Sequence, residues 1–235
     1  MYKGNKILGI IPARGGSKRI PRKNIKQLSG KPLVAWTIEQ AKSSKYIDNI
    51  IVSTEDEEIA EISKKYGAEV PFLRPKELAA DEAKVSDVVL HAINWFERNN
   101  EFYDLLVRLQ LTSPLRKIGD IDEAIELLFS KSAEAIISVC EVEHHPYWAG
   151  VLPEDGCMRD FLKPGTVGKS RQELPVCYRL NGSISLAYVN YLKNNRSFWG
   201  KNTYAYVMPR ERSLDIDYEI DFIVAETLMK NSKKH

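Results

Sequence analysis

Apolar and polar positions follow two different rhythms along roughly the first 140 residues of the chain. Short, continuously apolar runs such as ILGIIP are typical of strands that are buried on both faces of a sheet. Between them lie longer segments whose apolar residues recur every three or four positions, as in amphipathic helices. The apolar runs predict strands at residues 7–12, 48–55, 68–73, 103–110 and 133–142. The periodic segments predict helices at residues 31–44, 56–67, 84–100 and 120–131.

This alternation of strands and helices predicts an α/β fold with a doubly wound, mostly parallel sheet, in which ligands bind at the carboxyl ends of the strands. The alternation of strands and helices ends after residue 142. Residues 143–178 are rich in Pro and Gly and contain no amphipathic helix, so we expect an extended arm inserted in the domain. Further strands at 181–189 and 203–209 and a helix at 217–230 return the chain to the core, giving a single domain over 1–235.

Composition narrows the functional classes. The chain has 235 residues, 43% of them hydrophobic, which suits one domain with a sizeable core. A net charge of +2 argues against a general nucleic-acid or membrane-surface binder. Three cysteines without a CxxC spacing argue against a disulfide framework or a zinc site. The apolar segment near the N-terminus is too short for a secretory signal, so we expect a cytoplasmic location.

Positive charge is concentrated in one loop, ARGGSKRIPRKN, which directly follows the first predicted strand. Backbone N–H groups of Gly15, Gly16 and Ser17 can point at phosphate oxygens, and Arg14 and Lys23 can neutralise them. The loop has neither GxxxxGK[ST] nor GxGxxG, which disfavours a P-loop kinase and a dinucleotide oxidoreductase. The alternative is a solvated basic turn. The position of the loop at the end of a buried strand favours an oligophosphate site.

A pair of acids near the C-terminus suggests a metal site. Asp215 and Asp217 flank Ile216, so an extended backbone places both carboxylates on one side and the isoleucine in the core. Two such oxygen ligands suit Mg²⁺, which prefers carboxylates together with substrate phosphates and water. The alternative is an acid-rich first turn of a helix, which is our interpretation of Glu219 and Asp221.

Two further segments carry polar groups that could bind a ligand. Gln110 begins QLTSPLR at the end of the fourth strand, where side chains enter the ligand crevice of an α/β sheet. In RQELPVCYRLNG, Arg171 and Arg179 could clamp a carboxylate and Asn181 could offer amide hydrogen bonds. The alternatives are a turn that ends the strand and two solvated surface arginines. The pair HH before Pro146 does not share one face of a strand, so we expect a structural role for it.

Taken together, these motifs resemble the acylneuraminate cytidylyltransferases, also called CMP-sialic acid synthetases, over essentially the whole chain. The matching segments are PARGGSKRIPRKN, IVSTEDEEIA, GAEVPFLRPKELAADEA, QLTSPLR, EHHP, RQELPVCYRLNGSI and SLDID. The resemblance implies a three-layer, Rossmann-like nucleotidyltransferase core with an arm that pairs two subunits into a homodimer. It also implies the reaction of CTP with a nine-carbon 2-keto sugar acid, a nonulosonic acid, to give the CMP-sugar and pyrophosphate with Mg²⁺ (or Mn²⁺).

The resemblance also implies a role for each motif residue. The CTP phosphates would be held by Arg14, Ser17, Lys23 and Asn24. The cytosine would be lined by Arg74 and Ala83. The sugar would contact Gln110, Arg171, Arg179 and Asn181. The metal would be held by Asp215 and Asp217. The motifs contain no obvious general base, and our hypothesis is Asp217 itself or a metal-bound hydroxide.

Departures from the family pattern leave the exact sugar open. Leu111 stands where proline is common, and Trp148 stands where some sialate members carry lysine. The leading expectation is an N-acylneuraminate, and the alternative is legionaminic or pseudaminic acid. An alternative of another class is a non-catalytic protein that binds nucleotide sugars. The intact Arg14, Lys23, Asp215 and Asp217 argue against it.

Overall fold

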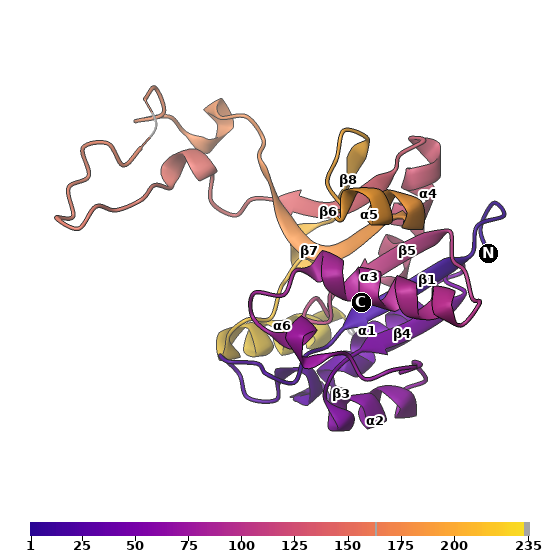
Figure 1. Cartoon of the computed structure of the whole chain (residues 1–235). Helices are drawn as coiled ribbons and strands as arrows, with labels where there is room; N and C mark the ends of the chain where they lie inside the picture. Colours follow the sequence, from indigo (N-terminus) through magenta and orange to yellow (C-terminus); the bar gives the residue numbers. More distant parts are fainter. Residues whose placement is uncertain (163, 233–235) are drawn as a thin grey trace.

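A six-stranded sheet forms the centre of the computed structural model, which describes residues 1–162 and 164–232 (Figure 1). The strand order is β4-β1-β5-β7-β6-β8. The strands are β1 (Ile7–Pro12), β4 (Asn49–Ser53), β5 (Leu105–Leu109), β6 (Ala135–Glu141), β7 (Tyr178–Tyr188) and β8 (Thr203–Val207). Three neighbouring pairs are parallel, and β7 runs antiparallel to both of its neighbours. The predicted α/β fold with a mostly parallel sheet is confirmed.

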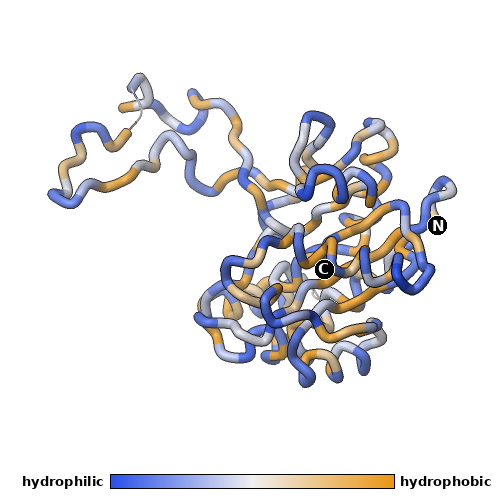
Figure 2. The backbone as a smooth tube through the Cα atoms, in the orientation of Figure 1, coloured by the Kyte–Doolittle hydropathy of each residue, from blue (hydrophilic) through white to orange (hydrophobic). Residues whose placement is uncertain are grey.

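Helices cover both faces of the sheet and complete three layers. One face carries α1 (Leu33–Lys42), α2 (Glu57–Lys65), α4 (Ile118–Ser130) and α6 (Glu219–Ser232). The other face carries α3 (Val85–Arg98) and α5 (Val189–Asn195). Successive strand residues point to opposite faces, so Leu105 and Val107 of β5 join the first core and Leu106 joins the second. Figure 2 shows this apolar centre as orange strands inside a more polar surface.

Three elements of the structure differ from the prediction. Residues 68–73 do not form a full strand, because only Glu69 and Leu73 make isolated parallel bridges to the β4 edge. Pro71 lies between them and has no N–H to donate, which prevents a continuous ladder. The short helix α5 follows β7 directly and was not predicted, since its seven residues give too little periodic pattern. The small hairpin β2 (Gln27–Leu28) and β3 (Lys31–Pro32) was also not predicted.

The predicted arm leaves the body of the protein between β6 and β7 (Figure 1). Its range includes Lys163, which, like residues 233–235, lies outside the described residues. Its only regular elements among the described residues are the short 3-10 turns η3 (Pro146–Trp148) and η4 (Arg171–Glu173). His145 is 4% exposed and its Nε2 lies 2.9 Å from the carbonyl oxygen of Pro175. This contact joins the two legs of the arm at its base, which is the structural role expected of the HH pair.

The strands β4, β1 and β5 are parallel neighbours, so their carboxyl ends meet at one edge of the sheet. The basic loop leaves β1 at this edge, and Gln110 follows β5 there. The segment that contains η2 (Lys76–Ala79) covers the same edge from the side of α3. This edge is therefore the place to look for a ligand site.

Candidate functional site

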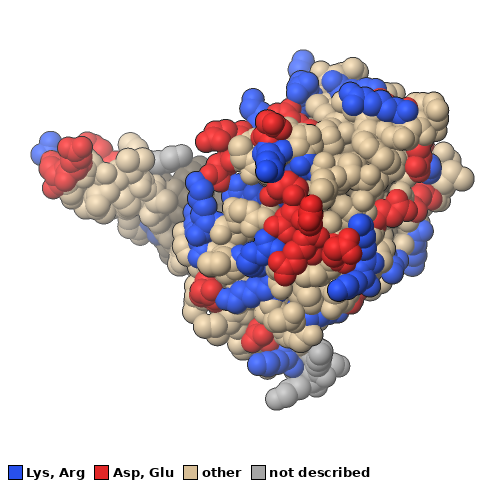
Figure 3. Space-filling model, turned by 60° about the horizontal axis from the view of Figure 1, so that its bottom comes forward, with Lys and Arg blue, Asp and Glu red and all other residues tan. Residues whose placement is uncertain are grey.

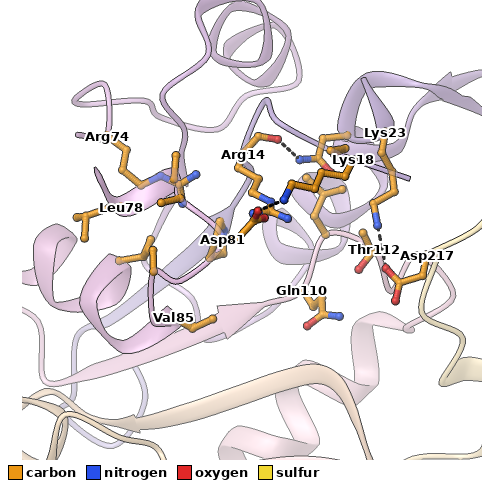
Figure 4. A pocket seen from close by; sticks show the side chains of 18 of the residues that line it. Arg14, Lys18, Lys23, Arg74, Leu78, Asp81, Val85, Gln110, Thr112 and Asp217 are labelled. Atoms are coloured by element: carbon orange, nitrogen blue, oxygen red, sulfur yellow. Dashed lines mark hydrogen bonds and ion pairs between the residues drawn. The ribbon is translucent and has the colours of Figure 1, made fainter. Parts of the chain in front are cut away.

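A cleft of about 550 Å³ opens at the carboxyl ends of β1 and β5 (Figure 4). It brings together the basic loop, the segment around η2, the end of β5 and the acid pair near the C-terminus. The polar residues that line it are Arg14, Ser17, Lys18, Arg19, Lys23, Asn24, Arg74, Asp81, Arg108, Gln110, Thr112 and Asp217. The cleft thus collects most of the residues that the motifs singled out.

Two cations of the basic loop bind the same carboxylate, that of Asp81. Arg14 Nη1 lies 2.7 Å from Asp81 Oδ1, and Lys18 forms an ion pair with the other carboxylate oxygen (Figure 4). Lys18 and Arg14 hold the pKa of Asp81 below its ordinary value by donating hydrogen bonds to it. Asn24 is buried and its Nδ2 donates to the backbone oxygen of Arg14 at 2.7 Å, which fixes the start of the loop. Asp81 thus supplies negative charge next to two cations of the basic loop.

Gly15 of the loop is required by close packing, whereas Gly16 is not. The Gly15 N–H donates to Glu55 Oε1 at 2.6 Å, and the Ser17 N–H donates to the Gly15 oxygen at 3.0 Å. These two groups are therefore engaged within the protein, whereas the sequence suggested that they point at phosphate. A Cβ atom at Gly15 would lie 2.6 Å from Asp56 Oδ2, so only glycine allows this approach, while a Cβ at Gly16 would meet open space.

The wall opposite the basic loop contains the two residues expected beside cytosine. Arg74 is only 5% exposed, and its Nη2 donates to Glu55 Oε2 at 2.7 Å. Glu55 therefore links Arg74 to the basic loop through its two carboxylate oxygens. Ala83 lines the same wall together with the apolar side chain of Leu78. A flat base could lie against such a partly apolar wall.

Asp217 is held by cations from the basic loop. Lys23 Nζ lies 3.1 Å from Asp217 Oδ1 and donates to the Ile216 oxygen at 2.6 Å (Figure 4). Arg19 Nη1 lies 3.3 Å from the other carboxylate oxygen of Asp217. The C-terminal acid pair and the N-terminal basic loop thus form one electrostatic unit across the cleft.

Asp215 is held by neutral donors instead. Gln110 Nε2 donates to Asp215 Oδ2 at 2.8 Å, and the Thr112 hydroxyl donates to the other oxygen. Ile216 is fully buried, and its N–H donates to the Thr112 oxygen at 2.9 Å, as an extended segment with the isoleucine in the core requires. Within the described residues, no group of three or more His, Cys, Asp or Glu side chains is arranged to hold a metal ion. A metal here would take its remaining ligands from substrate and water.

Two predicted sugar ligands lie at the base of the arm, away from the cleft of the single chain. Arg171 donates to Glu141 at 2.7 Å and to nearby backbone oxygens. Arg179 forms a two-point ion pair with Glu143, with distances of 2.9 and 2.7 Å. This hydrogen-bonded pair lowers the pKa of Glu143 to about 2. Both arginines are therefore matched by acids inside the chain.

Asn181 is also internal. It is 2% exposed, accepts a hydrogen bond from the Ser138 hydroxyl and donates to the Ser213 hydroxyl at 2.9 Å. It does not line the cleft. Its side chain ties β7 to β6 and to the segment that precedes Asp215, so it supports the site from behind.

Sequence reasoning missed Arg108, Asp81 and Glu55. Arg108 gave a usable signal, since it is a lone cation inside the apolar run LLVRL of β5. Asp81 and Glu55 stand in polar segments with several other acids, and pattern alone does not separate them from solvated neighbours. Their roles depend on contacts with residues far away in the sequence.

The charges on the surface are mixed. Figure 3 shows Lys and Arg side chains interspersed with Asp and Glu side chains over one face of the body, without a continuous basic surface. No helix within residues 1–162 and 164–232 is long and apolar enough to cross a membrane.

Comparisons with known proteins agree with the motif resemblance. CMP-N,N'-diacetyllegionaminic acid synthase of Legionella pneumophila is 36% identical over 229 residues, which cover 96% of this chain and 97% of the relative. N-acylneuraminate cytidylyltransferase of Streptococcus agalactiae is 40% identical over 220 residues, which cover 93% of this chain and 52% of the relative. The solved structure of CMP:2-keto-3-deoxy-manno-octonic acid synthetase complexed with CTP has a TM-score of 0.73 at 16% identity. The match covers 97% of this chain and 99% of that structure, and it shows the shared fold.

The family itself follows from two of these findings. A model of the cytidylyltransferase family matches residues 8–148, which is more than half of the chain and contains most of the cleft. Relatives above 30% identity extend the match over nearly the whole length. The chain therefore belongs to the cytidylyltransferase family and is a nucleotidyltransferase, as its motifs predicted.

Proposed function

We propose that this enzyme transfers CMP from CTP to a nine-carbon 2-keto sugar acid of the N-acylneuraminate type and releases pyrophosphate. The observation that carries the proposal is the cleft of about 550 Å³, which the cations of the basic loop line together with Asp217 and with Gln110, the residue that binds Asp215. Phosphoryl transfer requires positioning and neutralisation of charge more than a covalent nucleophile. The cleft offers both.

The triphosphate would bind along the basic loop. Arg14, Lys18 and Lys23 line the cleft, and each now contacts a carboxylate that a phosphate could replace. Binding of CTP would release Asp81 from Arg14 and Lys18. The cytosine would lie against the wall formed by Arg74 and Ala83. In this proposal, the α-phosphate would lie toward Gln110 and the acid pair.

The reaction then exchanges one phosphorus–oxygen bond for another. The anomeric hydroxyl of the sugar acid attacks the α-phosphorus, and the bond to the pyrophosphate oxygen breaks in line with the attack. The proton of the hydroxyl passes to a carboxylate, for which Asp217 is the candidate. Lys23 and Arg19, which both line the cleft and bind Asp217, would stabilise negative charge on the departing pyrophosphate.

Asp215 and Asp217 would hold the Mg²⁺ (or Mn²⁺) ion that the motif resemblance implies. The donor chemistry fits, because two carboxylates flank the buried Ile216 at the edge of a phosphate-sized cationic site. When bound, the ion would neutralise charge on phosphate oxygens. Gln110 and Thr112 keep Asp215 oriented for this role through their hydrogen bonds.

A homodimer formed through the arm is part of the proposal. The arm extends from the body (Figure 1). It exposes apolar side chains, so a second copy of the chain is a suitable partner for it. The exposed apolar residues are Val151, Leu152, Met158, Val167 and Val176. Sedimentation of a monomer at micromolar concentration would count against the dimer.

The test of the activity is pyrophosphate release from CTP and Mg²⁺ with a panel of acids: N-acetylneuraminate, diacetyllegionaminate, pseudaminate and Kdo. We expect release with at least one nine-carbon acid and strong preference among them. Preference for diacetyllegionaminate, the product sugar in the name of one relative, would support the alternative substrate within the same reaction. Binding of CTP without release from any acid would support a non-catalytic nucleotide-binding protein instead.

A further inference from the structure

Arg108 is a cation on the central strand β5, among apolar neighbours. Leu106 and Arg108 point to the same face of the sheet, the face covered by α3 and α5, because strand residues alternate. Arg108 Nη2 donates to the backbone oxygen of Gly182 at 2.6 Å, and both terminal nitrogens lie 3.3 to 3.4 Å from Gln110 Oε1. The guanidinium is therefore fixed in place by two neutral acceptors.

Within the described residues, no acidic side chain forms an ion pair with Arg108 within 4.0 Å. Its Nε atom is buried and has no hydrogen-bond partner. Burial lowers the pKa of Arg108 to about 10, and the charge of Asp215 opposes this only partly. An unpaired cation in such surroundings is costly to the folded protein, so a bound anion would be favoured there. Arg74, by contrast, already has Glu55 as its partner.

The position of Arg108 indicates where such an anion would bind. Arg108 and Val85 line both the cleft and an adjoining cavity of about 390 Å³. On the cleft side, Gln110 connects Arg108 to Asp215, since its Oε1 faces the guanidinium and its Nε2 donates to the carboxylate. An anion on Arg108 would thus lie beside the acid pair, where the reacting groups of the proposed reaction meet.

We infer that Arg108 recognises the carboxylate of the sugar acid, which would make it a specificity-determining residue of the proposed reaction. The inference rests on the proposed function. In the ring form of a 2-keto acid, the carboxylate and the reacting hydroxyl are bound to the same carbon atom. Fixing the carboxylate on Arg108 therefore brings the hydroxyl beside Gln110 and Asp215. A guanidinium can hold a carboxylate by two parallel hydrogen bonds, which also fixes its orientation.

Two other assignments fit the contacts less well. Arg171 and Arg179, which the sequence offered for the carboxylate, already pair with acids at the base of the arm. The phosphates of CTP already have cations in the basic loop, which follows β1. Arg108 lies on β5 instead, where its guanidinium contacts Gly182 of β7. Among the described residues, Arg108 is the cation of the cleft that forms no ion pair with an acidic side chain.

The test compares Arg108→Gln with wild-type protein in steady-state pyrophosphate release. We expect kcat/KM for the sugar acid to fall about 10- to 100-fold, as for loss of a charge-assisted pair, with KM for CTP unchanged within about threefold. Arg108→Lys keeps the positive charge but loses the planar guanidinium, so its kcat/KM should lie between the values for wild type and Arg108→Gln. Arg98→Gln, an exposed arginine at the end of α3, is the matched control and should behave as wild type.

The methyl ester of the sugar acid separates recognition from structural support. For wild-type protein, kcat/KM should fall from acid to ester by about the same factor as it falls from wild type to Arg108→Gln with the acid. For Arg108→Gln, kcat/KM should be the same with acid and ester. The inference would be overturned if Arg108→Gln lowered kcat/KM relative to wild type by the same factor with acid and ester, or if it raised only the KM for CTP. If Arg108→Gln does not fold, Arg108→Lys is compared on acid and ester in the same way.

A second readout does not depend on turnover. Calorimetric titration of acid and ester into wild-type protein should show binding of the acid only, and this preference should be lost in Arg108→Gln. Absence of pyrophosphate release from wild type would refute the proposed reaction, whereas equal binding of acid and ester would refute the role of Arg108.

Discussion

We predict that Asp81 competes with CTP for the basic loop, so that Asp81→Asn tightens the binding of CTP. The Asp81 carboxylate pairs with Arg14 at 2.7 Å and also with Lys18. Both pairs must break before a phosphate can occupy the same cations. Asparagine has nearly the same shape as aspartate but no charge. It therefore weakens the interactions with Arg14 and Lys18 without leaving a cavity.

The magnitude follows from exposure. The side chains of Arg14 and Asp81 are each 39% exposed and Lys18 is 78% exposed, so solvent screens both pairs. Ion pairs that are exposed in this way are weak, and the two pairs share one carboxylate, so the gain in CTP affinity on their loss should be small. We expect a roughly two- to fivefold lower Kd for CTP. Because Lys18 and Arg14 hold the pKa of Asp81 below its ordinary value, Asp81 is ionised throughout neutral pH and the effect should not change between pH 6 and 8.

Calorimetric titration of CTP with Mg²⁺, at low salt and at 0.5 M salt (roughly a 4 Å Debye length), measures the effect. We expect the advantage of Asp81→Asn at low salt to shrink at high salt. Glu61→Gln, which removes an exposed ion pair with Lys64 on α2, is the control and should leave the Kd unchanged. A Kd that is unchanged or higher in Asp81→Asn would refute the competition.

Three further predictions concern the acid pair, the Gln110 bridge and the arm. Asp215→Ala should abolish metal-dependent pyrophosphate release while the protein remains folded by circular dichroism, and full activity would exclude Asp215 from the site. Gly182→Ala should lower kcat about 10- to 100-fold, because Gly182 has φ +70° and a Cβ there would lie 2.7 Å from Gln110 Oε1. Unchanged kcat would show that Gln110 need not be held there. Glu143→Gln should lower the melting temperature at pH 6, and by progressively less as the pH falls from 4.5 toward 2. The pKa of Glu143 falls from 4.5 to about 2 on folding through its hydrogen-bonded pair with Arg179, so its stabilisation is complete above pH 4.5 and is lost as the pH falls toward 2. The pair is over one-third exposed, so the difference should stay below about 1 kcal/mol, and a constant difference across this pH range would contradict it.

Local patterns predicted the elements of the fold, because burial on one or both faces leaves a direct periodic trace in the sequence. The burial of Ile216 between two acids is one example, and it follows from strand alternation alone. The direction of β7 left no such trace, since an antiparallel central strand is as apolar as a parallel one. The failed strand at residues 68–73 shows the limit of apolar runs, because Pro71 removes a ladder hydrogen bond that hydrophobicity does not report.

The site was predictable where motifs group its residues and unpredictable where distant contacts decide. The basic loop and the acid pair were recognised separately, and the structure adds that Lys23 contacts Asp217 directly. Arg171 and Arg179 show the opposite case. Their partners Glu141 and Glu143 lie about 30 residues or more away in the sequence, so ion pairing within the chain could not be distinguished from ligand binding.

The most direct test of the proposed reaction uses a nonulosonic acid labelled with ¹⁸O in the anomeric hydroxyl, together with CTP and Mg²⁺. Mass spectrometry of the product and ³¹P resonance shifts report where the label resides. We predict one pyrophosphate released for each CMP-sugar formed, with the ¹⁸O in the bridge between the anomeric carbon and the α-phosphorus. Absence of a CMP-sugar with every acid of the panel, or label that is missing from this bridge, would contradict attack of the anomeric hydroxyl on CTP in this cleft.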